Sequence, residues 1–207
     1  MAALRMVEVV DVISEWCGRR ARHWSIAIRE NGFRLLPGGS PTIGGMSFDI
    51  TELSGGRAEQ YRQLREQAES LLAGETDRVA NSANLAALIF HALPDLNWAG
   101  FYFTRGAELV VGPFQGKPAC VRIAWGRGVC GAAAASGETQ VVPDVHAFPG
   151  HIACDADSRS EIVIPLRRGG AVLGVLDLDS PKPGRFDEVD RAGLEELAAV
   201  FVASLGD

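Results

Sequence analysis

The chain has 207 residues, of which 47% are hydrophobic and 22% are charged, which is enough for one well-packed domain with an appendage. The formal net charge is -6 and no basic cluster stands out, so nucleic acid is not expected as the main partner. No uncharged apolar run approaches the ~20 residues of a membrane-spanning helix, and Glu8 and Asp11 interrupt the apolar start where a signal peptide would be uncharged. These features predict a cytoplasmic protein without membrane contact.

The first 45 residues differ in character from the rest of the chain. They end in a Gly/Pro-rich run, LPGGSPTIGG at 36–45, which is typical of a linker, and Met46 follows directly. We therefore expect an N-terminal extension at residues 1–45, either disordered or upstream of the true translation start, and a domain at residues 46–207. Cys17 lies in the extension and is assigned no role.

The first half of the domain predicts two helices and three strands. Apolar residues recur at helical spacing over 55–74 and 78–93, which indicates two amphipathic helices. Alternating segments at 97–103 and 107–114 predict a hairpin, and 119–125 predicts a third strand.

The second half predicts a short helix at 129–137, a brief strand at 139–144, a hairpin over 161–179 and a final helix at 187–205. Residues 145–160 show no periodicity, and a loop of that length in a compact domain is usually functional or mobile. Successive hairpins flanked by helices indicate a single α+β domain, with a mainly antiparallel central sheet and helices packed on it.

Three of the four cysteines, Cys120, Cys130 and Cys154, lie within 35 residues of each other. No CxxC pair exists, which argues against a zinc ribbon or a thioredoxin-type motif. One such cysteine would be interpreted as a small buried hydrophobe, but three near loops favour thiol chemistry. Cys154 lies in the long loop, where it can move, whereas Cys130 follows Gly128 at a helix start, which lowers a thiol pKa. Either cysteine is therefore a candidate nucleophile.

Acidic and aromatic residues recur with the two-residue spacing of strands, each set on one face of its own strand. Asp177 and Asp179 are two apart on a strand and share a face, and Glu161 begins the neighbouring strand. Like charges on one face cost free energy unless a cation offsets them, which suggests a pocket for a cation. Trp98 and Tyr102 are four apart on another strand and also share a face.

Several segments together resemble the free methionine-(R)-sulfoxide reductase family, a branch of the GAF domains. They are NWAGFYF (97–103), GPFQGKPACVRI (112–123), GRGVCG (126–131), DVHAFPGHIACDADSRSEIVIPL (144–166) and GVLDLDSPKPGRF (174–186). The resemblance covers essentially residues 46–207, and the cysteine spacings of 10 and then 24 residues match the family pattern. It implies a GAF fold and an oxidoreductase that converts free methionine-(R)-sulfoxide to methionine, as in oxidative stress.

The resemblance implies that Cys154 attacks the substrate and Cys120 resolves the intermediate, with Cys130 as a second resolving thiol or an alternative nucleophile. A thiol that reduces a sulfoxide becomes a sulfenic acid, which a second thiol converts to a disulfide. Thioredoxin is the expected reductant. No cofactor is expected, and no metal either, because His151 and Cys154 form only half of a metal site.

The resemblance also implies substrate-binding roles for these acidic and aromatic residues. Glu161, Asp177 and Asp179 would hold the substrate's ammonium, and one of them could donate a proton. Trp98 would pack against the methyl-sulfinyl group, with Tyr102 a weaker candidate. GAF domains often pair through their terminal helices, so the resemblance is also compatible with a homodimer. The alternatives are a non-catalytic GAF module that binds a small ligand, and a thiol redox sensor.

Overall fold

The computed structural model describes residues 28–29, 32–33, 50–150 and 155–206. The chain divides into two compact units, residues 1–47 and 48–207, which are described separately. In the first unit, strands β1 (Ile28–Arg29) and β2 (Gly32–Phe33) pair antiparallel. Most of residues 1–45 lie outside the described part of the chain, so their expected character stays a prediction.

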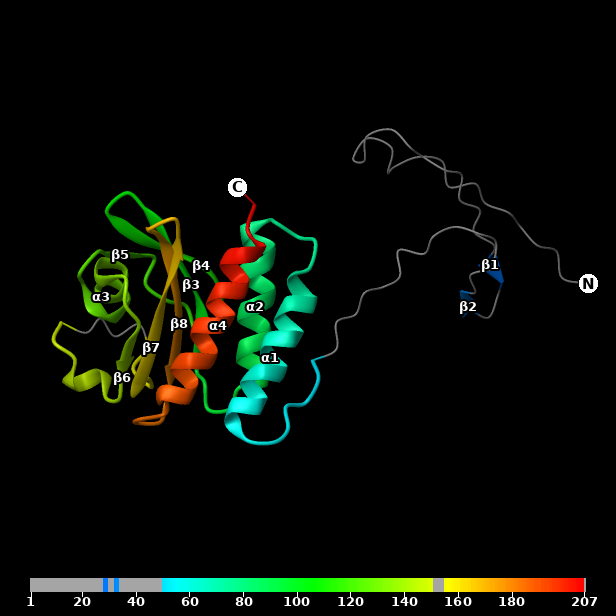
Figure 1. Cartoon of the computed structure of the whole chain (residues 1–207), viewed down its shortest axis with the longest axis horizontal. Helices are drawn as coiled ribbons and strands as arrows, with labels where there is room; N and C mark the ends of the chain where they lie inside the picture. The colour runs from blue at the N-terminus through cyan, green and yellow to red at the C-terminus, as the bar shows by residue number, and fades with distance from the viewer. Residues whose placement is uncertain (1–27, 30–31, 34–49, 151–154, 207) are drawn as a thin grey trace, which may run out of the picture. The chain divides into compact units, whose positions relative to one another are not determined.

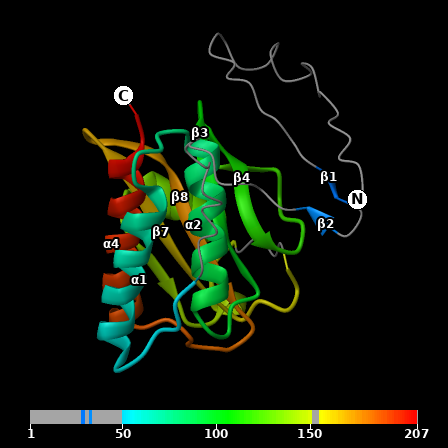
Figure 2. The ribbon, with the colours of Figure 1, turned by 90° about the vertical axis from the view of Figure 1, so that its right-hand side faces the viewer.

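Three helices of the second unit lie side by side in one layer (Figures 1 and 2). They are α1 (Arg57–Leu72), α2 (Arg78–Ala92) and α4 (Glu188–Ser204). Helix α2 begins where it does because the Asp77 side chain accepts a hydrogen bond from the Ala80 backbone N–H at 2.8 Å. Asp187 caps α4 in the same way. The helices expected at 55–74, 78–93 and 187–205 are confirmed.

The sheet has six strands in the order β5-β4-β3-β8-β7-β6, and each neighbouring pair is antiparallel. Gly169 and Gly170 join β7 to β8. Their φ angles of 56° and 84° are positive, as a two-residue hairpin turn requires. The expected α+β architecture is confirmed. The strands are β3 (Trp98–Arg105), β4 (Glu108–Gly116), β5 (Arg122–Ala124), β6 (Gln140–Val142), β7 (Ser160–Arg168) and β8 (Ala171–Ser180).

The two faces of the sheet bury different sets of side chains, because successive residues of a strand point to opposite faces. One face packs against the three-helix layer and forms the larger core, with Phe101, Ile162 and Leu178 fully buried. The opposite face carries α3 (Gly128–Ser136), which Figure 1 shows across the sheet from the other helices. A short 3-10 helix, η1 (Val145–Ala147), completes that side.

One expected strand is shorter than predicted from the sequence. The segment 119–125 was expected to be a strand opened by Cys120, but β5 begins only at Arg122. Pro118 has no N–H to donate to a ladder, and the described residues of the segment before Arg122 make only one backbone hydrogen bond to β4, from the Val111 N–H to the Val121 carbonyl oxygen. Cys120 therefore lies in the loop that leads into the strand.

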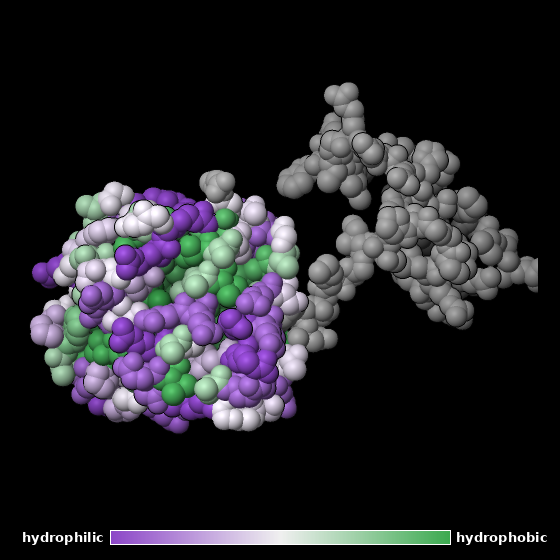
Figure 3. Space-filling model, in the orientation of Figure 1, coloured by the Kyte–Doolittle hydropathy of each residue, from purple (hydrophilic) through white to green (hydrophobic). Residues whose placement is uncertain are grey.

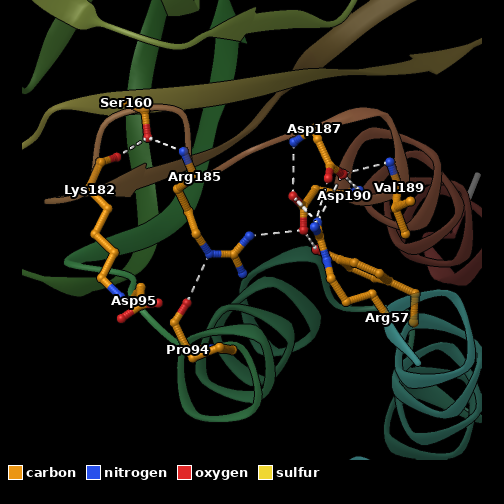
Figure 4. A network of polar contacts seen from close by, with 10 residues as sticks. Arg57, Pro94, Asp95, Ser160, Lys182, Arg185, Asp187, Val189 and Asp190 are labelled. Atoms are coloured by element: carbon orange, nitrogen blue, oxygen red, sulfur yellow. Dashed lines mark hydrogen bonds and ion pairs between the residues drawn. The ribbon is translucent and has the colours of Figure 1, made fainter. Parts of the chain in front are cut away.

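An ion-pair network anchors the start of α4 to α1 (Figure 4). Asp190 is fully buried and forms ion pairs with Arg57 and with Arg185, the latter at 3.0 Å. The Tyr61 hydroxyl donates to the same carboxylate at 2.8 Å. Removing one partner would leave buried charge uncompensated, so this network fixes how the helices meet.

Arg185, a member of this network, is also hydrogen-bonded to the start of strand β7, next to Glu161. The Ser160 hydroxyl donates to the Lys182 carbonyl oxygen at 2.6 Å and accepts from the Arg185 backbone N–H at 3.3 Å (Figure 4). Ser160 is fully buried and directly precedes Glu161. The backbone of β7 at Glu161 is thus held from the side of the helices.

The exterior of the folded domain, on the face seen in Figure 3, is a mixture of hydrophilic and hydrophobic residues. In the described part of the chain, no helix is long and apolar enough to cross a membrane.

Candidate active site

A pocket opens on the face of the sheet that carries α3. Its walls come from β3, β7, β8, the start of α3 and the loops on either side, and it encloses about 530 Å³ of empty space, including open solvent at its mouth. The lining residues are Trp98, Tyr102, Lys117, Pro118, Ala119, Ile123, Arg127, Gly128, Val129, Cys130, Asp155, Ser158, Glu161, Asp177 and Asp179.

Strand register brings the three predicted carboxyl groups to the floor of this pocket. Glu161 lies directly opposite Asp179 in the β7–β8 ladder, and Asp177 lies two residues earlier on the same face. The next strand places Trp98 opposite Asp179. Glu161 and Asp177 are each only 6% exposed, so this acidic group is buried rather than solvated.

The thiol of Cys130, on helix α3, contacts two of these carboxyl groups. Cys130 is the third residue of α3 and 4% exposed, and its Sγ lies 3.2 Å from Asp177 Oδ2 and 3.9 Å from Glu161 Oε1. The thiol can donate a hydrogen bond to one of these oxygens. The pocket therefore contains a buried thiol in contact with two carboxyl groups.

Burial opposes the ionisation of these three carboxyl groups. Burial raises the pKa of Asp177 to about 7. It also raises the pKa of Glu161 and of Asp179 well above the ordinary range, and the neighbouring carboxylates add to the effect. A cation bound beside these carboxyl groups would favour their ionised forms.

The same effects act on the Cys130 thiol. Burial first, and then the negative charge of Asp177 and Glu161, raise its pKa well above the usual range. The expectation that the helix N-terminus lowers this pKa is therefore wrong, because desolvation and two adjacent carboxyl groups outweigh the helix dipole. Cys130 is poorly suited to be the attacking thiolate.

One carboxylate oxygen in the pocket has no protein partner. Asp177 Oδ1 is buried without a hydrogen bond, while Oδ2 of the same carboxyl group contacts Cys130. A buried polar atom without a partner is costly. Because Asp177 lines the pocket, a ligand bound there would lie next to this carboxyl group.

Aromatic rings form one wall of the pocket. Trp98 is stacked between Tyr102 and Phe114, with ring centroids 5.9 Å and 5.2 Å away. Its Nε1 donates to the Lys117 carbonyl oxygen at 3.1 Å, which fixes the indole. Gly100 permits this stack, because a Cβ there would lie 2.3 Å from Phe114 Cβ. The structure thus brings both predicted aromatics to the site.

Polar residues that the sequence analysis did not identify line the pocket and the depression next to it. Lys117 forms ion pairs with Asp155 at 3.1 Å and Asp157 at 2.5 Å. Asn97 Nδ2 donates to Asp155 Oδ2 at 3.2 Å and to Ser158 Oγ at 3.0 Å. The Asp-x-Asp-Ser run after Cys154 could have indicated this cluster from the sequence. Asp and Ser side chains favour turns in which they hydrogen-bond the local backbone.

The three cysteines are not described equally. Cys130 lines the pocket, while Cys120 is half-buried and packs against the apolar residues around Trp98. Cys154 and His151 lie outside the described residues. The roles expected for Cys154 and Cys120 therefore stay predictions.

Comparisons with known proteins place this geometry in context. The family model described as GAF domain matches residues 80–204. Free methionine-R-sulfoxide reductase from Escherichia coli is 52% identical over 143 residues, which are 69% of this chain and 87% of that protein. The protein of the same name from Saccharomyces cerevisiae is 48% identical over 153 residues, 70% of this chain and 85% of that protein.

Among solved structures, the free methionine-R-sulfoxide reductase of Neisseria meningitidis in complex with its substrate superposes with a TM-score of 0.73. It is 48% identical, and the match covers 73% of this chain and 95% of that chain.

Proposed function

The chain belongs to the free methionine-R-sulfoxide reductase family of GAF domain proteins, and we propose that it is an oxidoreductase that reduces free methionine-R-sulfoxide to methionine. The observation that carries the proposal is the buried group of Glu161, Asp177 and Asp179, whose pKa values are raised by burial, beside an aromatic wall. Such a pocket suits a small molecule with both a cationic group and an oxygen that must be protonated.

In the first step, the Cys154 thiolate attacks the sulfur of the sulfoxide. The oxygen leaves with the cysteine sulfur and takes up one proton, so methionine is released and Cys154 becomes a sulfenic acid. We assign the attack to Cys154 rather than to Cys130 because burial and the neighbouring carboxyl groups raise the pKa of the Cys130 thiol, which disfavours its thiolate. The two electrons that reduce the substrate come from the Cys154 sulfur.

In the second step, the thiol of Cys120 attacks the sulfenic acid of Cys154. A disulfide forms and water leaves. The dithiol of thioredoxin then reduces this disulfide by thiol–disulfide exchange and restores both thiols. This cycle requires a reducing compartment, as is expected for the cytoplasm. Cys130 remains available as a second resolving thiol.

The carboxyl groups have two tasks. Ionised members of the group pair with the α-ammonium of the free amino acid, whose charge offsets their mutual repulsion. A member that stays protonated donates to the sulfoxide oxygen as the sulfur is attacked, and the pKa of about 7 of Asp177 suits a general acid near neutral pH. Trp98 packs against the methyl-sulfinyl end of the substrate.

The deciding experiment is a thioredoxin-coupled assay of the reduced protein with free methionine-R-sulfoxide, in which consumption of the reductant is followed. We expect continuous turnover that depends on thioredoxin. Absence of turnover with fully reduced protein would contradict the proposal and favour a thiol redox sensor or a non-catalytic ligand-binding module.

A further inference from the structure

Three donor atoms at the pocket floor have the spacing of a metal site. Ligand atoms of Cys130, Glu161 and Asp177 all lie within 4.8 Å of one another. A tetrahedral zinc with Zn–S of ~2.3 Å and Zn–O of ~2.0 Å separates sulfur from oxygen by about 3.5 Å. The observed distances from Cys130 Sγ, 3.2 Å to Asp177 and 3.9 Å to Glu161, lie on either side of that value.

A second observation points to a ligand at this place. Asp177 is more than nine-tenths buried and lines the pocket, yet its Oδ1 has no hydrogen-bond partner. The pocket leaves room beside the three donors for a fourth ligand such as water, as in zinc sites with three protein ligands.

The donor set selects among metals. A thiolate with two carboxylates suits a thiophilic divalent ion such as Zn²⁺ or Cd²⁺, whereas Mg²⁺ and Ca²⁺ prefer sites made of oxygen ligands alone. We propose that Cys130, Glu161 and Asp177 form a binding site for a thiophilic divalent metal ion, which occupies the place of a cationic ligand and inhibits the protein. The ion is an inhibitor and not a cofactor.

Metal binding follows from the same physical feature as ligand binding. A thiol binds a divalent ion as the thiolate and a carboxyl group as the carboxylate, so coordination of the ion releases any protons that these groups carry. An ammonium and a metal ion cannot both occupy the carboxylates. Only this competition with substrate rests on the proposed function, because metal binding needs no turnover.

The first test is a titration of the reduced, full-length chain with Cd²⁺, followed by the ultraviolet charge-transfer absorption of a cadmium–thiolate bond. We expect saturation near one equivalent. Cys130→Ser should abolish this absorption, and the matched control Cys120→Ser should retain it. An unchanged signal in Cys130→Ser, with an unchanged melting curve, would overturn the proposal, because the metal would then be bound by another thiol.

The second test measures Zn²⁺ affinity by competition with a chromophoric chelator. Loss of an outer-shell partner already weakens metal binding about 10- to 100-fold, so Asp177→Asn and Glu161→Gln should each weaken it at least about 10-fold. Exposed Glu138→Gln serves as the control and should have no effect. Equal affinity in all variants, or equally tight binding of Mg²⁺, would contradict the assigned ligands.

A final measurement links the site to substrate. Free methionine-R-sulfoxide should lower the apparent Zn²⁺ affinity of the unchanged protein. If Zn²⁺ binding passes the first two tests and substrate has no effect on it, the metal site stands and its role as a competitive inhibitor is wrong. The coupled assay independently decides whether the protein is a reductase.

Discussion

Lys117 Nζ lies 3.1 Å from Asp155 Oδ1, and this ion pair joins two segments that each carry a cysteine. Lys117 is three residues before Cys120, and Asp155 directly follows Cys154. A disulfide requires Cα atoms no more than ~7 Å apart. The ion pair therefore holds together the two parts of the chain whose thiols we expect to bond.

Replacing Lys117 by Gln should slow disulfide formation without preventing it. Lys117 is 60% exposed, and an exposed ion pair contributes ~0.2–1 kcal/mol, which corresponds to roughly 1.5- to 5-fold in rate. Rapid-quench measurement of disulfide after one turnover would test this. The control is Arg122→Gln, which removes an exposed ion pair between Arg122 on β5 and Glu108 on β4. The same rate in both variants would count against the bridging role.

The three cysteines should give different outcomes when each is changed to serine. Cys154→Ser should form no methionine, because the Cys130 thiol has a raised pKa and Cys120 is expected to resolve rather than attack. Cys120→Ser should form about one methionine per protein and then stall or slow as a sulfenic acid accumulates. Mass spectrometry of trapped intermediates would distinguish these outcomes. Loss of the first turnover in Cys130→Ser alone would show that the nucleophile is misassigned.

Asp177 should make the unliganded protein less stable as the pH rises. Its pKa is about 7 in the folded protein, against an ordinary value of 3.8. Between these values the native state binds more protons than the unfolded state, so the free energy of unfolding decreases as the pH increases. The full effect is on the order of a few kcal/mol at pH 8.

Asp177→Asn removes the free-energy cost of ionising a buried carboxyl group. The variant should therefore melt at a higher temperature than the unchanged protein at pH 8, and the difference should be smaller or reversed at pH 4.5. Thermal melts of both proteins across that range, with Glu138→Gln as the surface control, provide the test. Parallel curves at all pH values would show that Asp177 does not titrate in this window. The same variant should raise KM for free methionine-R-sulfoxide.

The free amino acid should be strongly preferred over methionine sulfoxide in a peptide. The nitrogen of a peptide bond is uncharged, so it leaves Glu161, Asp177 and Asp179 without a compensating cation, at a cost of a few kcal/mol. This corresponds to roughly a hundred-fold or more in kcat/KM. Initial rates for the free and the N-acetylated R-sulfoxide would test it, and comparable rates would exclude an ammonium pocket.

Residues 1–45 should be dispensable. They form most of a separate compact unit that ends at residue 47. A chain that begins at Met46 should keep the melting temperature and the activity of the full-length protein. A clear drop in melting temperature would show that the segment contributes to the stability of the domain.

Periodicity was sufficient to predict the main elements. The alternation in 97–103 places Trp98 and Tyr102 on one face of their strand, and that in 171–179 does the same for Asp177 and Asp179. Only the register of β3 with β8 brings the two pairs to the same face of the sheet. What could not be predicted is set by contacts between distant segments. Nothing local indicates that Lys117 meets Asp155, or that Cys130 is buried against carboxyl groups and thereby loses the pKa advantage of its helix start.

The alternation of β3, β7 and β8 separates two kinds of evolutionary constraint. Leu176 and Leu178 face the helical core, while Asp177 between them faces the pocket. A substitution at one position can therefore change ligand chemistry while its immediate neighbours continue to secure folding. Drift along a single strand could thus convert this scaffold from one small-molecule specificity to another, without an intermediate that has lost its core.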